Sequence, residues 1–409
     1  MHSLPAGRAM TRVFSVLLIA FSMTVLVKAD TLAPRPLVVL VSLDGFRPDY
    51  LKRGVSPNLD RLAREGVLAK GLVPVFPSLT FPNHVSLVTG QTPVHHGIVN
   101  NSMSDPAIPR RFSLSSDESK NPAWWQAARP IWVTAPAQGR VVSTVFWPGS
   151  EVLIDGMRPH DWLPYQHGMP LAKRVATLLD WVARPGADRP DLAMIYFSDV
   201  DSAGHEQGPE SKAVTEAIAR VDAALGMLIE GLQRIDLLNR TTLVIVSDHG
   251  MAAVRSDGKI DGSVLLEGFT SARWEWLGAT AGMRLNGENP GALLARLSKM
   301  PHLQCRPSDA LPVQWRMSPH PRVPDIVCVA DLGYIVVDSV TRLGPPGMHG
   351  YVPDEAQMQG LLLVSGYRIT PGHVGYVDLL DVHGLLYALL GAAAPQTDGT
   401  DALARTLLH

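Results

Sequence analysis

The segment Leu37-Val-Val-Leu-Val-Ser-Leu43, followed directly by Asp44, decides the fold of this chain. An uninterrupted apolar run of this length predicts a strand that is buried on both faces, as strands of parallel sheets are. Comparable apolar runs recur at wide intervals, at residues 141–146, 192–197, 243–246 and 361–364. The chain therefore contains several buried strands with long connections between them.

Helical patterns occupy the stretches between these strands. The clearest covers residues 57–65, with Ser56 as N-cap, Pro57 at the first helical position and Gly66 as the stop. Further helices are expected at residues 171–183, 211–232 and 379–390. Strands that alternate with helices indicate an α/β fold with a mostly parallel central sheet flanked by helices. In such folds, active sites lie just beyond the carboxyl ends of the strands.

Acidic residues follow three of the predicted strands. Asp44 follows the first strand, Asp199 and Asp201 follow the strand at 192–197, and Asp248 follows the strand at 243–246. Because the carboxyl ends of parallel strands meet at one edge of a sheet, we expect these carboxylates to lie close together.

Two stretches depart from this alternation, and we interpret both as insertions. One is rich in Pro and Trp and covers about residues 147–170, and the other covers about residues 251–342. The first is expected to form part of a substrate wall, and the second a small subdomain of short strands. Residues 30–409 otherwise read as one catalytic domain.

The amino terminus has the pattern of a signal peptide. Arg8 and Arg12 precede an apolar run over residues 13–27, and the run ends in small residues up to Ala29. A membrane anchor is the alternative, but the run is shorter than the roughly 20 apolar residues that a span needs. We predict a signal peptide over residues 1–29, no stable membrane anchor, and a periplasmic or extracellular protein.

Charge and cysteine content narrow the function further. The formal net charge is -2 and 18% of the residues are charged, so no broad basic face indicates binding to duplex nucleic acid. The two cysteines, Cys305 and Cys328, are close in sequence, and in an oxidising compartment they are expected to form a disulfide. Such a bridge would contribute about 3 kcal/mol. The alternative is a pair of buried thiols.

Three short segments offer oxygen and nitrogen ligands for a metal. They are Asp201-Ser-Ala-Gly-His205, Asp248-His249-Gly250 and Gly347-Met-His349-Gly-Tyr351. Each alone has an ordinary explanation, since a strand-end Asp is usually a cap and His349 could be a surface loop residue. Together they form a mixed set of carboxylates and imidazoles, which suits zinc.

The candidate nucleophile is Thr80. It lies in Val75-Phe-Pro-Ser-Leu-Thr80-Phe-Pro-Asn-His84, where a helix is expected to begin, and a helix amino terminus favours an anion. The segment lacks the arrangement of a Ser-His-Asp triad, so metal coordination is the expected means of activating the hydroxyl. His84 is interpreted as a structural residue rather than a base.

Taken together, these segments resemble the nucleotide pyrophosphatase/phosphodiesterase family of the alkaline phosphatase superfamily, in its single-domain bacterial form. The resemblance covers nearly all of the mature chain and implies an alkaline-phosphatase-like core. The segments that carry it are VSLDGFR (41–47), FPSLTFPNH (76–84), HGIVNN (96–101), WPGS (147–150), DSAGH (201–205), SDHG (247–250) and GMHGY (347–351).

The resemblance implies a two-zinc phosphodiesterase that acts through a phosphothreonine at Thr80. One Zn²⁺ would be held by Asp44, Thr80, Asp248 and His249, and the other by Asp201, His205 and His349. Asn101 would bind a non-bridging phosphate oxygen, and the group esterified to the phosphate would lie among Phe81, Tyr165 and Tyr196.

Alternatives remain at this point. A monoesterase or phosphotransferase of the same superfamily could use the same metals, and a non-catalytic exported zinc-binding protein would need no hydroxyl beside them. Ser78 and Val352 depart from the commonest family pattern but replace no proposed ligand. Arg47 is expected in a structural salt bridge, which leaves the neutral Asn101 as phosphate donor and favours a diester. Nucleotides, dinucleotide polyphosphates, nucleotide sugars and choline lipids remain possible substrates, and a monomer is expected.

Overall fold

The computed structural model describes residues 1–3, 35–340 and 344–408. Residues 35–408 belong to one compact unit. The predicted signal peptide at residues 1–29 lies outside the described residues, apart from the first three. Within the described part of the chain, no helix combines the length and the apolar character that crossing a membrane requires.

A seven-stranded sheet forms the centre of this unit, in the order β17-β2-β16-β7-β1-β6-β5. Its strands, in chain order, are β1 (Leu37–Leu43), β2 (Val67–Val73), β5 (Val142–Val145), β6 (Leu192–Phe197), β7 (Thr241–Val246), β16 (Leu362–Gly366) and β17 (Gly372–Asp378). All neighbours pair in parallel except β16, which is antiparallel to both β2 and β7. The predicted α/β fold with a mostly parallel sheet is confirmed.

The buried strands lie where the apolar runs predicted them, but β2 and β17 were missed. The sequence of β2 begins immediately after the stop of the preceding helix and contains Lys70 and Gly71. Strand β17 is an edge strand that pairs only with β2, and its side chains are largely exposed. Neither strand therefore has the continuous apolar run that marks a strand buried on both faces.

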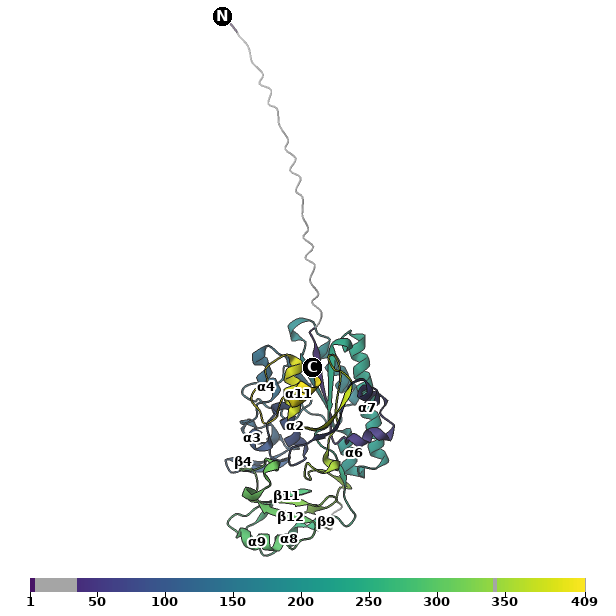
Figure 1. The fold of residues 1–409 in the computed structure, drawn as a ribbon. Helices are drawn as coiled ribbons and strands as arrows, with labels where there is room; N and C mark the ends of the chain where they lie inside the picture. Colours follow the sequence, from purple (N-terminus) through teal and green to yellow (C-terminus); the bar gives the residue numbers. More distant parts are fainter. Residues whose placement is uncertain (4–34, 341–343, 409) are drawn as a thin grey trace. The chain divides into compact units, whose positions relative to one another are not determined.

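Helices cover both faces of this sheet (Figure 1). The helices that matter most for the site are α1 (Pro57–Glu65), α2 (Thr80–Thr89), α5 (Leu171–Val182), α6 (Asp199–Gln207), α7 (Lys212–Arg234), α10 (Asp381–Leu390) and α11 (Ala402–Leu407). Helices α6 and α7 lie together on one side, and α2 and α11 on the other (Figure 1). Helix α5 packs against β6 and α10 against β1. All residues of β1, β6 and β7 are buried.

The N-cap residue of α1 is Ser56, as predicted, but its side chain does not satisfy the free N–H groups of the first turn. The buried hydroxyl of Ser56 makes no hydrogen bond. The carboxylate of Asp222 on α7 accepts from the backbone N–H of Asn58 at 3.2 Å and of Leu59 at 2.8 Å instead. A residue more than 160 positions away thus satisfies the free donors of the first helical turn.

Residues 251–342 contain a second sheet, in the order β10-β11-β13-β12. Its strands are β10 (Arg273–Trp276), β11 (Thr280–Arg284), β12 (Leu303–Pro307) and β13 (Ile326–Ala330), and α8 (Gly262–Leu265) and α9 (Pro290–Leu297) lie with it (Figure 1). This part has a hydrophobic core of its own. Cys305 and Cys328 lie directly opposite each other on β12 and β13 and form a disulfide.

Several short strands and helices also lie in the described chain. They are β3 (Ser102–Asp105), β4 (Ile108–Ser113), α3 (Pro93–His96), α4 (Ile131–Thr134), β8 (Ala252–Ala253), β9 (Lys259–Asp261), β14 (Ile335–Val337) and β15 (Gly347–Met348). Strand β15 pairs with β8, and this pairing brings His349 to the carboxyl end of β7.

Candidate active site

The candidate ligands meet at the carboxyl ends of three adjacent strands. Strand β1 pairs in parallel with both β6 and β7, so the residues that follow them are brought together. Asp44 follows β1, helix α6 begins after β6 and carries Asp201 in its first turn, and Asp248 follows β7. The strand topology thus explains why acids far apart in sequence share one site.

One donor group consists of Asp201, His205 and His349. One turn of α6 separates Asp201 from His205, and Nε2 of His205 lies 3.5 Å from Oδ1 of Asp201. Nε2 of His349 lies 3.7 Å from the same carboxylate oxygen and 3.0 Å from Nε2 of His205. Three ligand atoms therefore converge on one point.

A second donor group surrounds His249. Its Nε2 lies 3.5 Å from Oδ1 of Asp44 and 3.1 Å from Oδ2 of Asp248. Asp44, Asp201 and His249 also satisfy the spacing of a metal site, so Asp201 lies between the two groups. All seven residues predicted as metal ligands thus lie in this part of the molecule, including Thr80, which is described below.

Backbone carbonyls fix the orientation of all three imidazoles. Nδ1 of His205 lies 3.0 Å from the carbonyl oxygen of Gly347, and Nδ1 of His249 lies 2.8 Å from that of Gly250. Nδ1 of His349 lies 2.8 Å from the carbonyl oxygen of Ser78. A carbonyl only accepts, so each Nδ1 must carry the proton and each Nε2 presents a lone pair to the site.

The carboxylates have matching free oxygens. Oδ1 of Asp44, Oδ1 of Asp201 and Oδ2 of Asp248 are buried and accept no hydrogen bond. Burial raises the pKa of Asp44 and of Asp248 well above the ordinary value, and the neighbouring carboxylates raise it further. Burial lowers the pKa of His349 to about 4, so this imidazole is neutral. Free carboxylate oxygens and imidazole lone pairs at one place fit divalent cations.

Thr80 begins helix α2 and faces the second donor group. Its Oγ1 lies 3.3 Å from Nε2 of His249. The side chain of Asn83 shapes the preceding loop, since it accepts from the N–H of Val75 at 2.7 Å and donates to the carbonyl of Leu79 at 2.9 Å. Ser78 is no rival hydroxyl, because it is buried and donates to the carbonyl of Tyr351 at 2.9 Å.

His84 has a structural position, as interpreted from the sequence. Its Nε2 lies 2.8 Å from Oγ of Ser42, and its Nδ1 lies 2.9 Å from the carbonyl oxygen of Thr80. Although His84 also lies near Asp44 and Asp248, both of its nitrogens have partners. His249 is the imidazole with a free nitrogen there, so we assign His249 to the donor set.

Asn101 lies near Thr80, the candidate nucleophile. Its side-chain oxygen accepts from the backbone N–H of Phe81 at 2.8 Å, which leaves the amide N–H groups to donate. Both residues line a pocket of about 670 Å³ that also contains Asp44, Thr80 and Asp201. The arrangement presents a neutral donor next to the Thr80 hydroxyl.

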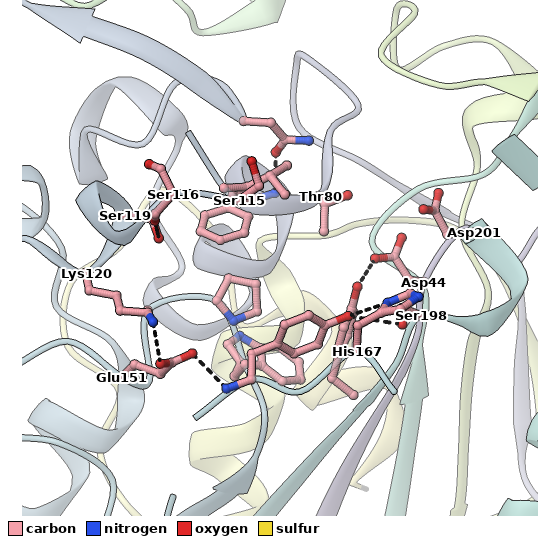
Figure 2. A pocket seen from close by; sticks show the side chains of 18 of the residues that line it. Asp44, Thr80, Ser115, Ser116, Ser119, Lys120, Glu151, His167, Ser198 and Asp201 are labelled. Atoms are coloured by element: carbon pink, nitrogen blue, oxygen red, sulfur yellow. Dashed lines mark hydrogen bonds and ion pairs between the residues drawn. The ribbon is translucent and has the colours of Figure 1, made fainter. Parts of the chain in front are cut away.

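Three aromatic residues predicted to surround the esterifying group, Phe81, Tyr165 and Tyr196, line the same pocket. Tyr196 also has a role that the sequence did not suggest, because its hydroxyl donates to Oδ2 of Asp44 at 2.5 Å. Figure 2 shows Asp44, Thr80 and Asp201 at one end of this pocket.

The opposite end of the pocket is polar. Lys120 and Glu151 lie there as an ion pair of 3.5 Å, and Glu151 also accepts from the N–H of Tyr165 at 2.9 Å (Figure 2). Neither residue was predicted from the sequence. Lys120 ends a short 3-10 helix (Asp117–Lys120) and Glu151 lies in a turn. Neither segment has a distinctive sequence pattern, and only the fold brings them to the site.

Arg47 lies in ion pairs, as predicted. It contacts Asp49 at 2.5 Å and Glu210 at 2.9 Å. Its guanidinium is therefore held by two carboxylates. Arg47 does not line the pocket of about 670 Å³.

Comparison with known proteins gives a consistent result. The profile of the family described as "Type I phosphodiesterase / nucleotide pyrophosphatase" matches residues 38–352. The chain is 34% identical over 380 residues to bovine (Bos taurus) ectonucleotide pyrophosphatase/phosphodiesterase family member 3, with 89% of this chain and 43% of that protein covered. It is 31% identical over 390 residues to a bis(5'-adenosyl)-triphosphatase of Xenopus laevis, with 91% and 82% covered.

A solved structure is also similar. The inactive murine ectonucleotide pyrophosphatase/phosphodiesterase 5, in complex with AMP, has a TM-score of 0.87 and 30% identity, with 92% of this chain and 100% of that chain covered. The chain spans less than half the length of several mammalian relatives that it matches.

Proposed function

Because this chain belongs to the type I phosphodiesterase/nucleotide pyrophosphatase family, we propose that it is a two-zinc enzyme that hydrolyses phosphodiester or pyrophosphate bonds of nucleotides through a phosphothreonine at Thr80. The observation that carries the proposal is the Thr80 hydroxyl 3.3 Å from His249, beside two converging groups of ligand atoms. A site that only stored metal would need no hydroxyl there.

The donor set fits two zinc ions. Asp44, Asp248 and His249, with Thr80, would hold one ion, and Asp201, His205 and His349 the other. When bound, divalent cations of this kind lower the pKa of a hydroxyl and stabilise the charge that develops on a reacting phosphoryl group.

The residues of the chain itself provide orientation. The amino terminus of α2 places Oγ1 of Thr80 next to the phosphate position, and the N–H groups of Asn101 donate to a non-bridging oxygen. The hydroxyl of Tyr196 holds Asp44 in place. A single neutral donor suits the single negative charge of a diester.

In the proposed reaction, the Thr80 oxygen bonds to phosphorus while the bond from phosphorus to the first ester oxygen breaks. The hydroxyl proton leaves to solvent, and the departing alcohol or phosphate takes up one. Water then bonds to phosphorus and loses one proton, while the bond to the Thr80 oxygen breaks and that oxygen takes up a proton. A nucleoside 5'-monophosphate is released. The nucleoside would lie between Phe81 and Tyr165 in the pocket.

The names of similar proteins support this substrate class, since one is a bis(5'-adenosyl)-triphosphatase and another was solved with AMP. We further propose export to the periplasm or the extracellular space, on the basis of the amino-terminal sequence, and a monomeric enzyme.

A pair of kcat/KM values tests the proposed function. On one metal-replete preparation, a nitrophenyl ester of a nucleoside 5'-monophosphate should be hydrolysed with much higher kcat/KM than nitrophenyl phosphate. The two share a leaving group, but only the diester can use binding energy from the aromatic pocket. Equal or better hydrolysis of the monoester would replace this proposal with a phosphomonoesterase.

A further inference from the structure

A buried arginine from the part of the chain that contains the second sheet holds the segment that carries Asn101. Arg322 lies in the loop before β13 and is 8% exposed. Its Nη1 donates to the carbonyl of Gly97 at 2.6 Å, and its Nε donates to Oδ2 of Asp105 at 2.7 Å. Asn101 lies midway between these two partners in the sequence. One guanidinium therefore holds both ends of the segment 97–105.

The same guanidinium also reaches the wall of the pocket. Nη1 of Arg322 donates to the carbonyl of Trp124 at 2.8 Å, and the guanidinium lies 4.9 Å from the centre of the Trp124 ring. The indole N–H of Trp124 in turn donates to Glu118 at 3.0 Å. Glu118 belongs to the 3-10 helix Asp117–Lys120, which lines the pocket. Arg322 thus joins this wall to the segment 97–105.

These contacts depend on the shape of the guanidinium as well as on its charge. Arg322 and Asp105 form an ion pair in which both side chains are largely buried. Burial alone would raise the pKa of Asp105, but hydrogen bonds from Arg322 and from the N–H of Ala107 hold it below its ordinary value, so the carboxylate is charged. Arginine presents its donors in a rigid planar fork, whereas lysine is a point charge. Lysine at this position would keep the charge and lose the fixed set of contacts.

The segment 97–105 is otherwise packed into the protein around Asn101. Ile98 and Val99 are fully buried, and Asn100 is 6% exposed. Asn101 is the residue of this segment that lines the pocket, where its oxygen accepts from the N–H of Phe81. The direction of its free N–H groups therefore depends on how the segment is held. An error of about 1 Å in the position of such a group can cost about 10²-fold in rate.

On the basis of the proposed function, we infer that Arg322 is a positioning residue, which holds the segment 97–105 so that the amide of Asn101 faces a non-bridging oxygen of the phosphate. Arg322 does not line the pocket of about 670 Å³, so it acts through Asn101 rather than on the substrate. Through Arg322, the insertion at residues 251–342 contributes to the placement of a phosphate-binding group.

A double-mutant cycle tests whether Arg322 acts through Asn101. Arg322→Lys should lower kcat/KM for a nitrophenyl ester of a nucleoside 5'-monophosphate by about tenfold or more, mainly through kcat, because the aromatic residues that bind the nucleoside are unchanged. In the Asn101→Ala background, the same substitution should lower kcat/KM by less than about twofold. An unchanged kcat/KM in folded Arg322→Lys, or equal losses in both backgrounds, would overturn the inference.

Arg284→Lys is the matched control. Arg284 donates to the carbonyl of Pro321 at 2.7 Å and lies 4.0 Å from Asp325, so it contacts the loop that carries Arg322. Its replacement disturbs this loop but keeps the contacts of the Arg322 guanidinium, and kcat/KM should stay within about twofold of the wild type. A loss equal to that of Arg322→Lys would mean that any disturbance of the loop is sufficient, and would overturn the specific role of Arg322.

Thermal unfolding shows whether these variants are folded. If Arg322→Lys does not fold, Asp105→Asn replaces it in the cycle, because it removes the charge that Nε of Arg322 contacts and keeps the shape of the side chain. The same coupling to Asn101→Ala is expected. Equal losses in both backgrounds would again contradict the inference.

An equilibrium measurement gives the same cycle without turnover. In calorimetric titrations of the metal-replete protein with AMP, Arg322→Lys should weaken binding by about threefold to tenfold, and by less than about twofold in the Asn101→Ala background. If this coupling is present but the wild type hydrolyses no nucleotide diester, the proposed function fails and the role of Arg322 stands. If the wild type hydrolyses these diesters but the two substitutions act independently, only the role of Arg322 fails.

Discussion

Oγ1 of Thr80 lies 3.3 Å from Nε2 of His249, and that same nitrogen lies 3.5 Å from Oδ1 of Asp44. Because the Gly250 carbonyl holds the opposite ring nitrogen at 2.8 Å, the free nitrogen of His249 is fixed toward both oxygens. The hydroxyl proposed as the nucleophile therefore lies among ligand atoms that strand ends and backbone carbonyls have already positioned.

The two groups of ligand atoms predict how much metal the protein binds. The purified protein should contain two zinc ions per chain, and exhaustive chelation should abolish activity until zinc is restored. His205→Ala should lower the metal content to about one ion per chain, because one of three donors at that position is lost. Elemental analysis after dialysis measures this, with the exposed His373→Ala as control. Full activity in a metal-free protein would refute the assignment.

Tyr196→Phe should separate the two roles of Tyr196. The variant keeps the ring on the pocket wall but loses the hydroxyl that donates to Asp44 at 2.5 Å. We expect kcat to fall by about tenfold with little change in KM, because Asp44 loses a group that holds it in place. Tyr165→Phe is the matched control, since that hydroxyl contacts Ser198 and His167, each at 3.3 Å, rather than Asp44. A rise in KM with unchanged kcat would mean that Tyr196 acts only on the substrate.

The first turn of α1 should depend on Asp222 rather than on Ser56. Asp222→Ala leaves the backbone donors of Asn58 and Leu59 unsatisfied and should lower the free energy of unfolding by about 2–3 kcal/mol. Ser56→Ala removes a hydroxyl without a partner and should change it by less than about 0.5 kcal/mol. Chemical denaturation of the two variants measures this, and the reverse order of effects would restore Ser56 as the cap.

Because His383 is buried as a neutral imidazole, we expect the free energy of unfolding to decrease as the pH falls below about 7. His383 is fully buried in α10, both ring nitrogens lack a partner, and burial lowers its pKa to about 3. Below the ordinary pKa of about 6.5, the unfolded chain takes up a proton that the folded protein does not. Stability contributed by the neutral ring is therefore lost as the pH falls from about 7 toward 3.

From pH 7 to pH 5 this single group accounts for about 2 kcal/mol of the loss. His383→Leu should reduce the difference in unfolding free energy between the two pH values by that amount, and the exposed His373→Leu should not. Urea unfolding at both pH values is the measurement. An unchanged pH dependence in His383→Leu would show that the imidazole is not held neutral.

The sequence was sufficient for the parts of the fold that rest on local patterns. Apolar runs located β1 and β6, and the acids that follow them were identified as one site because parallel strands end at one edge. Strand β17 could not be found in this way, since an exposed edge strand carries Gly and polar residues. Its pairing with β2 depends on the whole sheet.

Long-range contacts account for the features of the site that were missed. The ion pair of Lys120 with Glu151, the hydrogen bond of Tyr196 to Asp44, and the cap supplied by Asp222 all join residues distant in sequence. No local pattern marks any of them. The ligand segments could be recognised from the sequence, because their candidate ligand side chains lie within a few residues of one another, as in Asp201 to His205.

The most direct test of the central claim is the turnover of Thr80→Ala, measured together with its metal content. In the proposed mechanism, Thr80 supplies the attacking oxygen and only one donor at its metal position. The variant should therefore keep two zinc ions while kcat for a nucleotide diester falls by about 10³-fold or more. Thr80→Ser should retain part of the activity. A folded, metal-replete Thr80→Ala whose kcat lies within about tenfold of the wild type would contradict Thr80 as the nucleophile.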